Sequence, residues 1–502
     1  MKKYTLIFIA FLLPQFLIAQ INWTYSTNPV LSMDTTVMWA AYGQPTCIIQ
    51  NDTFKMWYAV ASGTHPLDTL PVGRIHYAWS TDGTNWTKYP GNPVMDVGVN
   101  GSWDDEWLDT PEILWDGTEL KLYYYGDSTY YQGQDNTNIG LATSTDGINW
   151  TRKGIVLQKG SPGEWDGKYI ESPAAYYDTV SGVYALIYTG TDTIGWIRLG
   201  LAVSSDGYNW IKNPTNPVLD HGILGSWDDL FVAVPAMIYS DGVFEMWYSA
   251  VSLIGQWDSV WVGYATSLNG TDWIKYPGNP VLKMNPPDTA GFWAVDVVWD
   301  DAGNEYKMYY ENIYISDASA IYKAEAPRSI LFSAYCNTNV SNDTTIVLGD
   351  SITLFASGGM YYQWYPETGL NNPNIPNPKT SPDSTTAYRV MIVSDSCITV
   401  DTVVITVIPV GIDEGNGLET ELKIYPNPAR YVVYVSFLTS SLNLQAASFE
   451  LVDMLGKVII SEAIIQNSKR LAFHVSELPE GIYLVRIMDN ESIISKKLII
   501  LK

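Results

Sequence analysis

The sequence predicts an all-β protein, a five-bladed β-propeller followed by two small β-sandwich domains. Short motifs recur about every 60 residues in the first part of the chain. Turns of the Asp-Gly type separate runs of β-branched and aromatic residues, and no stretch shows a convincing amphipathic helix. With 502 residues, of which 46% are hydrophobic and 16% charged, the chain is long enough for about three folded domains.

The chain begins with a segment typical of secretory signal peptides. Two lysines follow Met1, an apolar run extends from Tyr4 to Ile18, and Ala19-Gln20 fits a cleavage site. Residues 1–19 are therefore predicted to be a signal peptide, and an N-terminal anchor is the alternative. No later run reaches the roughly 18 apolar residues of a spanning helix, so no transmembrane segment is expected in the mature chain.

Residues 20–328 are predicted to form the propeller. A turn motif of the form Ser-x-Asp/Asn-Gly-x-Asn/Asp-Trp ends at Trp86, Trp150, Trp210 and Trp273. A strand motif with two adjacent aromatic residues begins at Lys55, Lys121, Glu245 and Lys307. The Asp-Gly pair supplies the positive φ that a tight hairpin demands, so each unit predicts one blade of short strands. The segment Ala320–Ala326 is expected to complete the first blade and close the ring.

Two further domains follow the propeller. Residues 333–410 are poorer in Trp and richer in Ser, Thr, Asn and Pro, and their alternating strands predict an Ig-like β-sandwich. A polar linker covers 411–420, and 421–502 form a second all-strand domain. An exported chain permits disulfides, so Cys336 and Cys397 can pair, while Cys47 is expected to be buried.

The charge balance excludes some partners. A net charge of −25 makes nucleic acid and anionic membrane surfaces poor partners, because both bind Lys/Arg clusters. The 20 Trp and 35 Tyr instead provide flat amphipathic faces for polar ligands such as sugars. No cofactor is expected. The four histidines show no ligand spacing, and the Asp-Asp pairs at 104–105, 228–229 and 300–301 are expected to be solvated carboxylates rather than a structural Ca²⁺ site.

The C-terminal domain resembles the sorting domain of type IX secretion substrates in the Bacteroidetes. The matching motifs are Ile424-Tyr-Pro-Asn-Pro-Ala429, Leu451-Val-Asp-Met-Leu-Gly-Lys457, Leu478-Pro-Glu-Gly-Ile-Tyr-Leu484 and Lys496-Lys-Leu-Ile-Ile500. The resemblance implies export by the type IX machinery and a released or surface-held protein. The preceding domain is similar to the Ig-like repeats of such proteins, through Tyr362-Gln-Trp-Tyr-Pro366 and Thr385-Thr-Ala-Tyr388.

The propeller is similar to the superfamily that contains arabinanases, β-xylosidases, invertases and levansucrases. The motifs that carry this similarity are Trp-Asp-Asp, a following Pro, Lys-Met-Trp-Tyr, the Asp-Gly turn with its Trp, and Asn-Pro-Val-Leu. The resemblance implies a secreted glycosidase-like protein that acts on a polysaccharide or oligosaccharide.

Carboxylates from neighbouring blades are expected to meet in the central channel, where the innermost strands face one another. Counting six residues on from the Trp of the Trp-Asp motif gives Asp109, Glu171 and Ala233, each two residues before a Pro. Blade 1 offers Gly43 and Gln44 before its Pro, and blade 5 offers Asp296 nearby. A pair of carboxylates in one pocket is what glycoside hydrolysis needs.

The resemblance assigns roles to these residues. Glu171-Ser-Pro173 resembles the family's Glu-x-Pro, which carries the general acid, and Asp109 matches the Asp that orients the substrate and raises the pKa of the acid. The family's base in blade 1 is an Asp, but here Gln44 occupies that place, and Gln cannot act as a base. Asp34, Glu112 and above all Asp296 are the possible replacements. Gln44, Trp103, Trp165 and Trp227 are expected to contact substrate.

Three functions remain open at this stage. The first is glycoside hydrolysis, or phosphorolysis in which bound phosphate replaces the missing base. The second is a catalytically silent glycan-binding propeller. The third is a structural or protein-binding surface domain, in which Asp109 and Glu171 would be ordinary partners of backbone amides.

Overall fold

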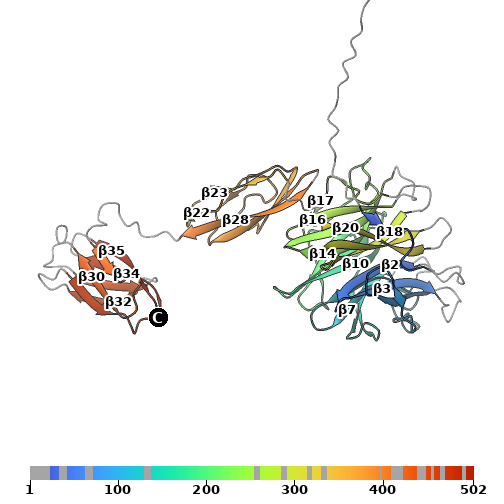
Figure 1. Ribbon diagram of the computed structural model, residues 1–502, viewed down its shortest axis with the longest axis horizontal. Coiled ribbons are helices and arrows are strands. Elements are labelled where there is room, and N and C mark those ends of the chain that lie inside the picture. Colours follow the sequence, from blue (N-terminus) through green and yellow to red (C-terminus); the bar gives the residue numbers. More distant parts are fainter. Residues whose placement is uncertain are drawn as a thin grey trace, which may run out of the picture. The chain divides into compact units, whose positions relative to one another are not determined.

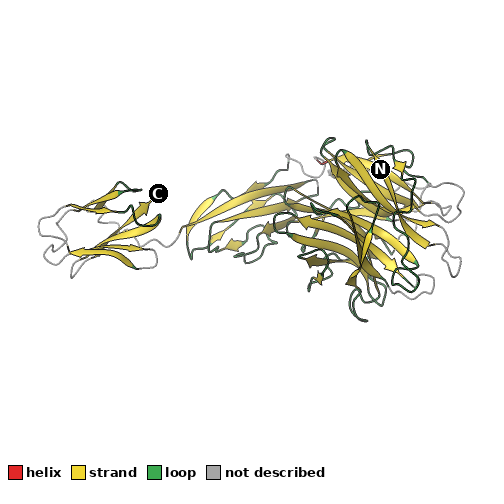
Figure 2. Cartoon of the chain, turned by 90° about the horizontal axis from the view of Figure 1, so that it is seen from below, coloured by secondary structure: helices red, strands yellow, loops and turns green. Residues whose placement is uncertain are grey.

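The computed structural model describes residues 23–32, 42–62, 72–128, 137–253, 260–283, 291–313, 319–328, 336–395, 397–408, 422–437, 448–453, 457–463, 470–488 and 493–502. The predicted signal peptide and the predicted linker 411–420 lie outside these residues. The chain forms two compact units, 1–344 with 351–381 and 386–405, and 345–350 with 382–385 and 406–502. The regular elements are strands, which confirms the all-β prediction (Figure 2). Among the described residues, no helix is long and apolar enough to cross a membrane.

The propeller consists of five blades of four antiparallel strands each (Figure 1). The innermost strands are β2 (Tyr42–Gln50), β6 (Trp107–Trp115), β10 (Tyr169–Asp178), β14 (Phe231–Ser240) and β18 (Gly291–Asp300). The second strands are β3 (Thr53–Ser62), β7 (Leu120–Asp127), β11 (Val183–Thr191), β15 (Val243–Val251) and β19 (Glu305–Ile313). The third strands are β4 (Val72–Ser80), β8 (Asn138–Ser144), β12 (Ile197–Ser204), β16 (Trp261–Ser267) and β20 (Ser319–Pro327). The outer strands are β5 (Thr87–Lys88), β9 (Thr151–Gln158), β13 (Ile211–Lys212), β17 (Ile274–Lys275) and β1 (Thr24–Tyr25).

The ring closes in the fifth blade. The N-terminal strand β1 pairs with β20 through Thr24 opposite Glu325 and Tyr25 opposite Ala324. The segment Ala320–Ala326 is therefore the third strand of the last blade, and the N-terminal strand adds the outer strand to it. This corrects the expectation that Ala320–Ala326 completes the first blade. Pairing the two ends of the propeller sequence within one sheet joins the first unit to the last.

The repeated turns link neighbouring blades. In the first turn, the Asp82 carboxylate accepts hydrogen bonds from the amides of Thr84 (2.8 Å) and Asn85 (2.7 Å), while Gly83 takes a φ of 68°. These bonds hold the pKa of Asp82 well below its usual range. The Tyr309 hydroxyl of blade 5 donates to the Gly83 carbonyl (2.9 Å), and the Trp86 ring packs edge-on against Tyr309. The motif thus has a structural role between blades.

Two further sets of strands follow. The Ig-like strands are β21 (Asn339–Val340), β22 (Thr344–Val347), β23 (Ile352–Thr353), β24 (Ala356–Ser357), β25 (Tyr361–Tyr365), β26 (Lys379–Thr380), β27 (Thr386–Val393) and β28 (Ile398–Ile408). Trp364 and Tyr388 are fully buried among them, and the predicted Cys336–Cys397 disulfide is present. Cys47 is free and buried, as predicted.

The C-terminal domain is a two-sheet sandwich. Its strands are β29 (Leu422–Tyr425), β30 (Val432–Phe437), β31 (Ser448–Asp453), β32 (Val458–Ala463), β33 (Arg470–His474), β34 (Gly481–Met488) and β35 (Ile493–Ile500). One sheet has the order β29-β30-β33 and the other β32-β31-β34-β35. Alternate residues of these strands, including Val433, Leu451 and Val485, form its apolar core.

Candidate active site

Every innermost strand carries a β-bulge at the same level of the ring. In the first four blades, the residue before the bulge is Gly43, Asp109, Glu171 or Ala233, and each pairs with a residue of the second strand. In blade 5, Asp296 lies opposite Tyr309, just as Glu112 lies opposite Tyr123 in blade 2. This register makes Trp293 the fifth member of the set. We call Gly43, Asp109, Glu171, Ala233 and Trp293 the channel positions.

The backbone is strained immediately after the channel positions. Gln44, Thr110, Ser172 and Val234 have φ values of 56°, 42°, 49° and 48°. Such a conformation is unfavourable for residues with a Cβ, especially the β-branched Thr and Val, and costs on the order of 1–3 kcal/mol each. Strain of this kind gathers at functional sites, and here it marks the same level of four consecutive blades.

Hydrogen bonds between blades hold this strained level in place. The Ser172 amide donates to the Thr110 hydroxyl (3.1 Å), and the Val234 amide donates to the Thr189 hydroxyl (3.0 Å). Each bond joins the backbone of one blade to a side chain of the preceding blade. The bulged strands are therefore fixed against one another rather than free to relax.

Asp109 and Glu171 lie close enough for the charge of Asp109 to act on Glu171. Burial, and after it the charge of Asp109, raises the pKa of Glu171 from 4.5 to about 7. Burial also raises the pKa of Asp109, against the hydrogen bonds donated by the Thr110 amide (2.8 Å) and the Trp107 indole (3.2 Å). Burial and the neighbouring Asp109 charge thus both favour the protonated form of Glu171. The catalytic roles of both residues remain predictions.

Asp296 does not lie at a channel position. It lies three residues after Trp293 and accepts a hydrogen bond from the Cys47 amide (2.6 Å). Glu112 occupies the same register in blade 2 and accepts bonds from the Ala175 amide (2.8 Å) and the Thr46 hydroxyl (3.2 Å). Burial raises the pKa of Asp296 to about 7, and burial with the Asp296 charge raises that of Glu112.

Glu112 and Asp296 line a narrow cavity on the proline side of the bulges. Its volume is about 20 Å³, which fits little more than a water molecule. Gln44 also lines it, and the buried Gln44 side-chain oxygen accepts no hydrogen bond within the described part of the chain. The roles expected for Asp296 and Gln44 stay predictions, and Asp34 lies outside the described residues.

Trp103, Trp165 and Trp227 pack within their own blades. Their rings lie 5.6, 5.5 and 6.0 Å from the rings of Tyr124, Tyr188 and Tyr248. Trp103 also covers Gly126, where an added Cβ would come within 2.3 Å of the indole. All three tryptophans are half-buried. Their predicted contact with substrate stays a prediction.

The expectation of solvated Asp-Asp pairs is wrong for two of the three pairs. Asp104 and Asp228 are buried and form ion pairs with Arg152 (2.9 Å) and Lys275 (2.6 Å). The long basic side chains of the outer strands reach inward to neutralise them. In the part of the chain that the structure describes, no group of three acidic, His or Cys residues is placed to hold a metal ion.

Among the carboxylates that sequence reasoning missed is that of Glu311. This residue lies in β19, and a Cβ added to Gly43 would be 3.1 Å from its Oε2 atom. The signal was present in the repeated strand motif. The residue after the aromatic pair is Ala59, Tyr125 and Ser249 in three other units, and it is acidic in the last.

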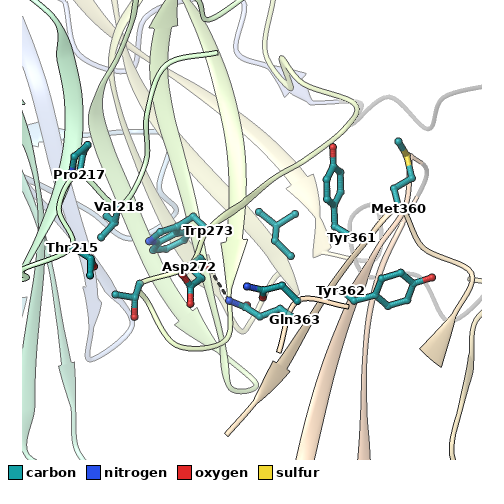
Figure 3. Close-up of a pocket in the computed structure, with 12 residues that line it drawn as sticks. Thr215, Pro217, Val218, Asp272, Trp273, Met360, Tyr361, Tyr362 and Gln363 are labelled. Carbon is teal, nitrogen blue, oxygen red and sulfur yellow. Dashed lines mark hydrogen bonds between the residues drawn. The ribbon is translucent and has the colours of Figure 1, made fainter. Parts of the chain in front are cut away.

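A separate hollow lies where blade 4 meets the Ig-like strands, within the first compact unit. Its volume is about 430 Å³, and its lining includes Asp272, Trp273 and Tyr361 (Figure 3). Gln363 fixes this junction, because its side chain accepts a bond from the Leu268 amide and donates one to the Asp272 carbonyl, both 2.7 Å. None of the predicted site residues lines this hollow.

Comparison with family models matches two parts of the chain. Residues 102–226 match the glycosyl hydrolases family 32 N-terminal domain, and 423–501 match the secretion system C-terminal sorting domain. The first match spans Asp109 and Glu171. The second confirms the predicted sorting domain, and with it export by type IX secretion to the cell surface or beyond.

Two curated relatives match part of the chain. A 1,2-beta-oligomannan phosphorylase of Thermoanaerobacter sp. (strain X514) is 29% identical over 232 residues, which are 45% of this chain and 70% of the phosphorylase. An uncharacterized protein of Mycobacterium tuberculosis is 29% identical over 184 residues, and the match spans only 56% of that protein's length.

A solved structure supports the same fold. The structure of BT0996 in an RGII complex superposes with a TM-score of 0.50 at 17% identity, covering 61% of this chain and 92% of the BT0996 chain. The chain thus contains a propeller that matches a glycosyl hydrolase domain over residues 102–226, and it is a secreted protein with a secretion-system C-terminal sorting domain.

Proposed function

We propose that the propeller cleaves glycosidic bonds in an extracellular oligosaccharide or polysaccharide, with Glu171 as the general acid. The observation that carries this proposal is the raised pKa of Glu171, about 7, beside Asp109 at adjacent channel positions. At pH 7 a carboxylic acid with a pKa of 4.5 is protonated in roughly one molecule in 300, and one with a pKa of about 7 in roughly half. Glu171 can therefore give a proton to the leaving oxygen at neutral pH.

The relatives suggest which sugars to test first. The Thermoanaerobacter protein is named for 1,2-linked β-oligomannan, so β-mannooligosaccharides head the panel of substrates. Plant and microbial polysaccharides follow, because a secreted protein meets polymers outside the cell.

Phosphorolysis is a second candidate, and two observations favour it. The blade-1 channel position is a glycine, so among the described residues of that blade no carboxylate is placed to activate water at this level. One relative is a phosphorylase. In phosphorolysis, inorganic phosphate attacks the anomeric carbon, the glycosidic bond breaks, and Glu171 protonates the leaving oxygen. The product is then a sugar phosphate.

The test is sugar release by the full mature chain from this panel, with and without phosphate. We expect Glu171→Gln to lower the rate about 10²- to 10⁴-fold on natural glycans, with a melting temperature at neutral pH no lower than that of the wild type, because the raised pKa of Glu171 disfavours its ionised form in the folded state. Glu305→Gln, a half-buried carboxylate at the start of β19, is the matched control. Unchanged turnover in Glu171→Gln would sink the acid assignment. Binding without release by the wild type would favour a silent glycan-binding propeller.

A further inference from the structure

The space beside Gly43 is filled by a carboxylate from the neighbouring blade. The three atoms nearest to a Cβ built on Gly43 all belong to Glu311, its Oε2 at 3.1 Å and its Cδ and Oε1 at 3.4 Å. Gly43 has no positive φ, so its backbone does not require glycine. The missing side chain leaves room, and the Glu311 carboxyl group occupies it.

Glu311 follows a rule that the other blades share. Its register position in the second strand faces the channel level of the next blade. In blade 4 the Ser249 hydroxyl donates to the Trp293 carbonyl (3.0 Å), and in blade 2 the charge of Glu171 contributes to the raised pKa of Tyr125. In the same way, the side chain of Glu311 in blade 5 reaches across the junction that closes the ring and lies beside Gly43 of blade 1. Among the five residues at this register, the one acidic residue is Glu311.

The three carboxylates therefore lie at the channel level of three consecutive blades, 1, 2 and 3. Going round from blade 5, Glu311 reaches the level of blade 1, Asp109 belongs to blade 2 and Glu171 to blade 3. Glu311 is only 5% exposed, so its carboxyl group is held within the protein rather than extended into solvent. The described residues of blade 1 place no carboxylate at this level, and the carboxyl group of Glu311 lies there instead.

We propose that Glu311 supplies the second carboxylate of the cleavage site and makes the reaction a hydrolysis. This inference rests on the proposed function of Glu171. In the step, a water oxygen attacks the anomeric carbon while Glu311 takes one proton from that water. The bond between the anomeric carbon and the leaving oxygen breaks, and the leaving oxygen takes the proton of Glu171. Phosphate is then not required.

The first experiment compares Glu311→Gln, Glu171→Gln and the control Glu305→Gln in the full mature chain, on a natural glycan and on an aryl glycoside with a good leaving group. Glu311→Gln is expected to lower the rate at least 100-fold on both substrates, since attack by water is impaired whatever leaves. Glu171→Gln is expected to lose activity mainly on the natural glycan. A fully active Glu311→Gln overturns the inference.

The second experiment moves the carboxylate back to blade 1. Glu311→Ala vacates the space beside residue 43, so the double variant Gly43→Asp/Glu311→Ala has room for a carboxylate there. We expect this double variant, and added azide acting on Glu311→Ala, each to recover at least tenfold over Glu311→Ala alone. A residue with a merely structural role would give no such rescue, so a failure of both overturns the inference.

The two proposals fail in different ways. If the wild type releases sugar only with phosphate, and Glu171→Gln is inactive, the acid assignment stands and the role of Glu311 is overturned. If Glu171→Gln keeps full activity on natural glycans, the proposed function fails, whatever Glu311→Gln does. Circular dichroism and melting temperatures of all variants separate loss of chemistry from loss of fold.

Discussion

Asp109→Asn tests the electrostatic reasoning most directly, because it removes the charge that acts on Glu171. The new amide keeps an oxygen for the Thr110 amide and loses only the acceptor for the Trp107 indole. Burial is the larger cause of the raised pKa of Glu171, and the Asp109 charge is the smaller one. Asp109 therefore accounts for less than half of the rise from 4.5 to about 7, on the order of one pKa unit.

The sign of the effect follows from the role of Glu171 as an acid. Only its protonated form donates, so activity is present below a pH of about 7 and is lost as the pH rises through that value. In Asp109→Asn this loss moves about one pH unit toward acid. At pH 7 the protonated fraction falls from roughly one half to roughly one tenth, which lowers the rate about fivefold through this effect alone.

The assay is kcat/KM against pH, which reports the groups of the free enzyme. Wild type, Asp109→Asn and Glu171→Gln are compared on one substrate. A basic limb that stays in place in Asp109→Asn would refute the coupling between the two carboxylates. A basic limb with the same midpoint in Glu171→Gln would refute the identity of the acid.

Three further predictions concern stability. Asp296→Asn should raise the melting temperature by about 2 °C or more at pH 8 and by less at pH 5, because the wild type loses stability as the pH rises from the ordinary pKa of 3.8 to the raised one of about 7; the reverse pH dependence would contradict this. Trp103→Ala should cost about 3–5 kcal/mol in denaturant unfolding, whereas unchanged stability with a raised KM would indicate a substrate platform instead. Cys336→Ser opens a loop with a sequence separation of 61 and should cost about 4 kcal/mol, so insensitivity of the wild type to reductant would argue against this disulfide.

The fold could be predicted because each blade repeats the same local chemistry. The turn ending at Trp86 needs glycine for its φ, an Asp or Asn to bind the following amides and a Trp to pack on the neighbouring blade, and these needs recur in four of the five units. Because the Gly, the Asp or Asn and the Trp of this turn recur at a fixed spacing, the repeat can be recognised in the sequence. The closing strand was placed in the wrong blade because β1 is only Thr24–Tyr25, too short to show alternation.

The candidate site could be predicted only where it follows the repeat. Asp109 and Glu171 were found because both precede the bulge at a constant distance from Trp103 and Trp165. Asp296 was placed beside the channel because blade 5 lacks the Pro that fixes the register elsewhere. The pairing of β18 with β19, which sequence spacing does not show, places Asp296 at the level of Glu112 instead.

The sequence analysis did not identify Glu311 as a candidate site residue, because the channel of a propeller is lined by side chains of neighbouring blades. Aligning units one beneath another compares each residue with its equivalents, and by that comparison blade 1 has no acid at its channel position. The carboxylate comes instead from the blade before it, through the second strand, and the pairing of β1 with β20 is what brings the last blade round to the first. In the sequence, this arrangement shows only as a glycine at the channel position of blade 1. The structure adds that the backbone of Gly43 does not require glycine. The absence of a side chain at Gly43 therefore leaves the space that the carboxyl group of Glu311 occupies.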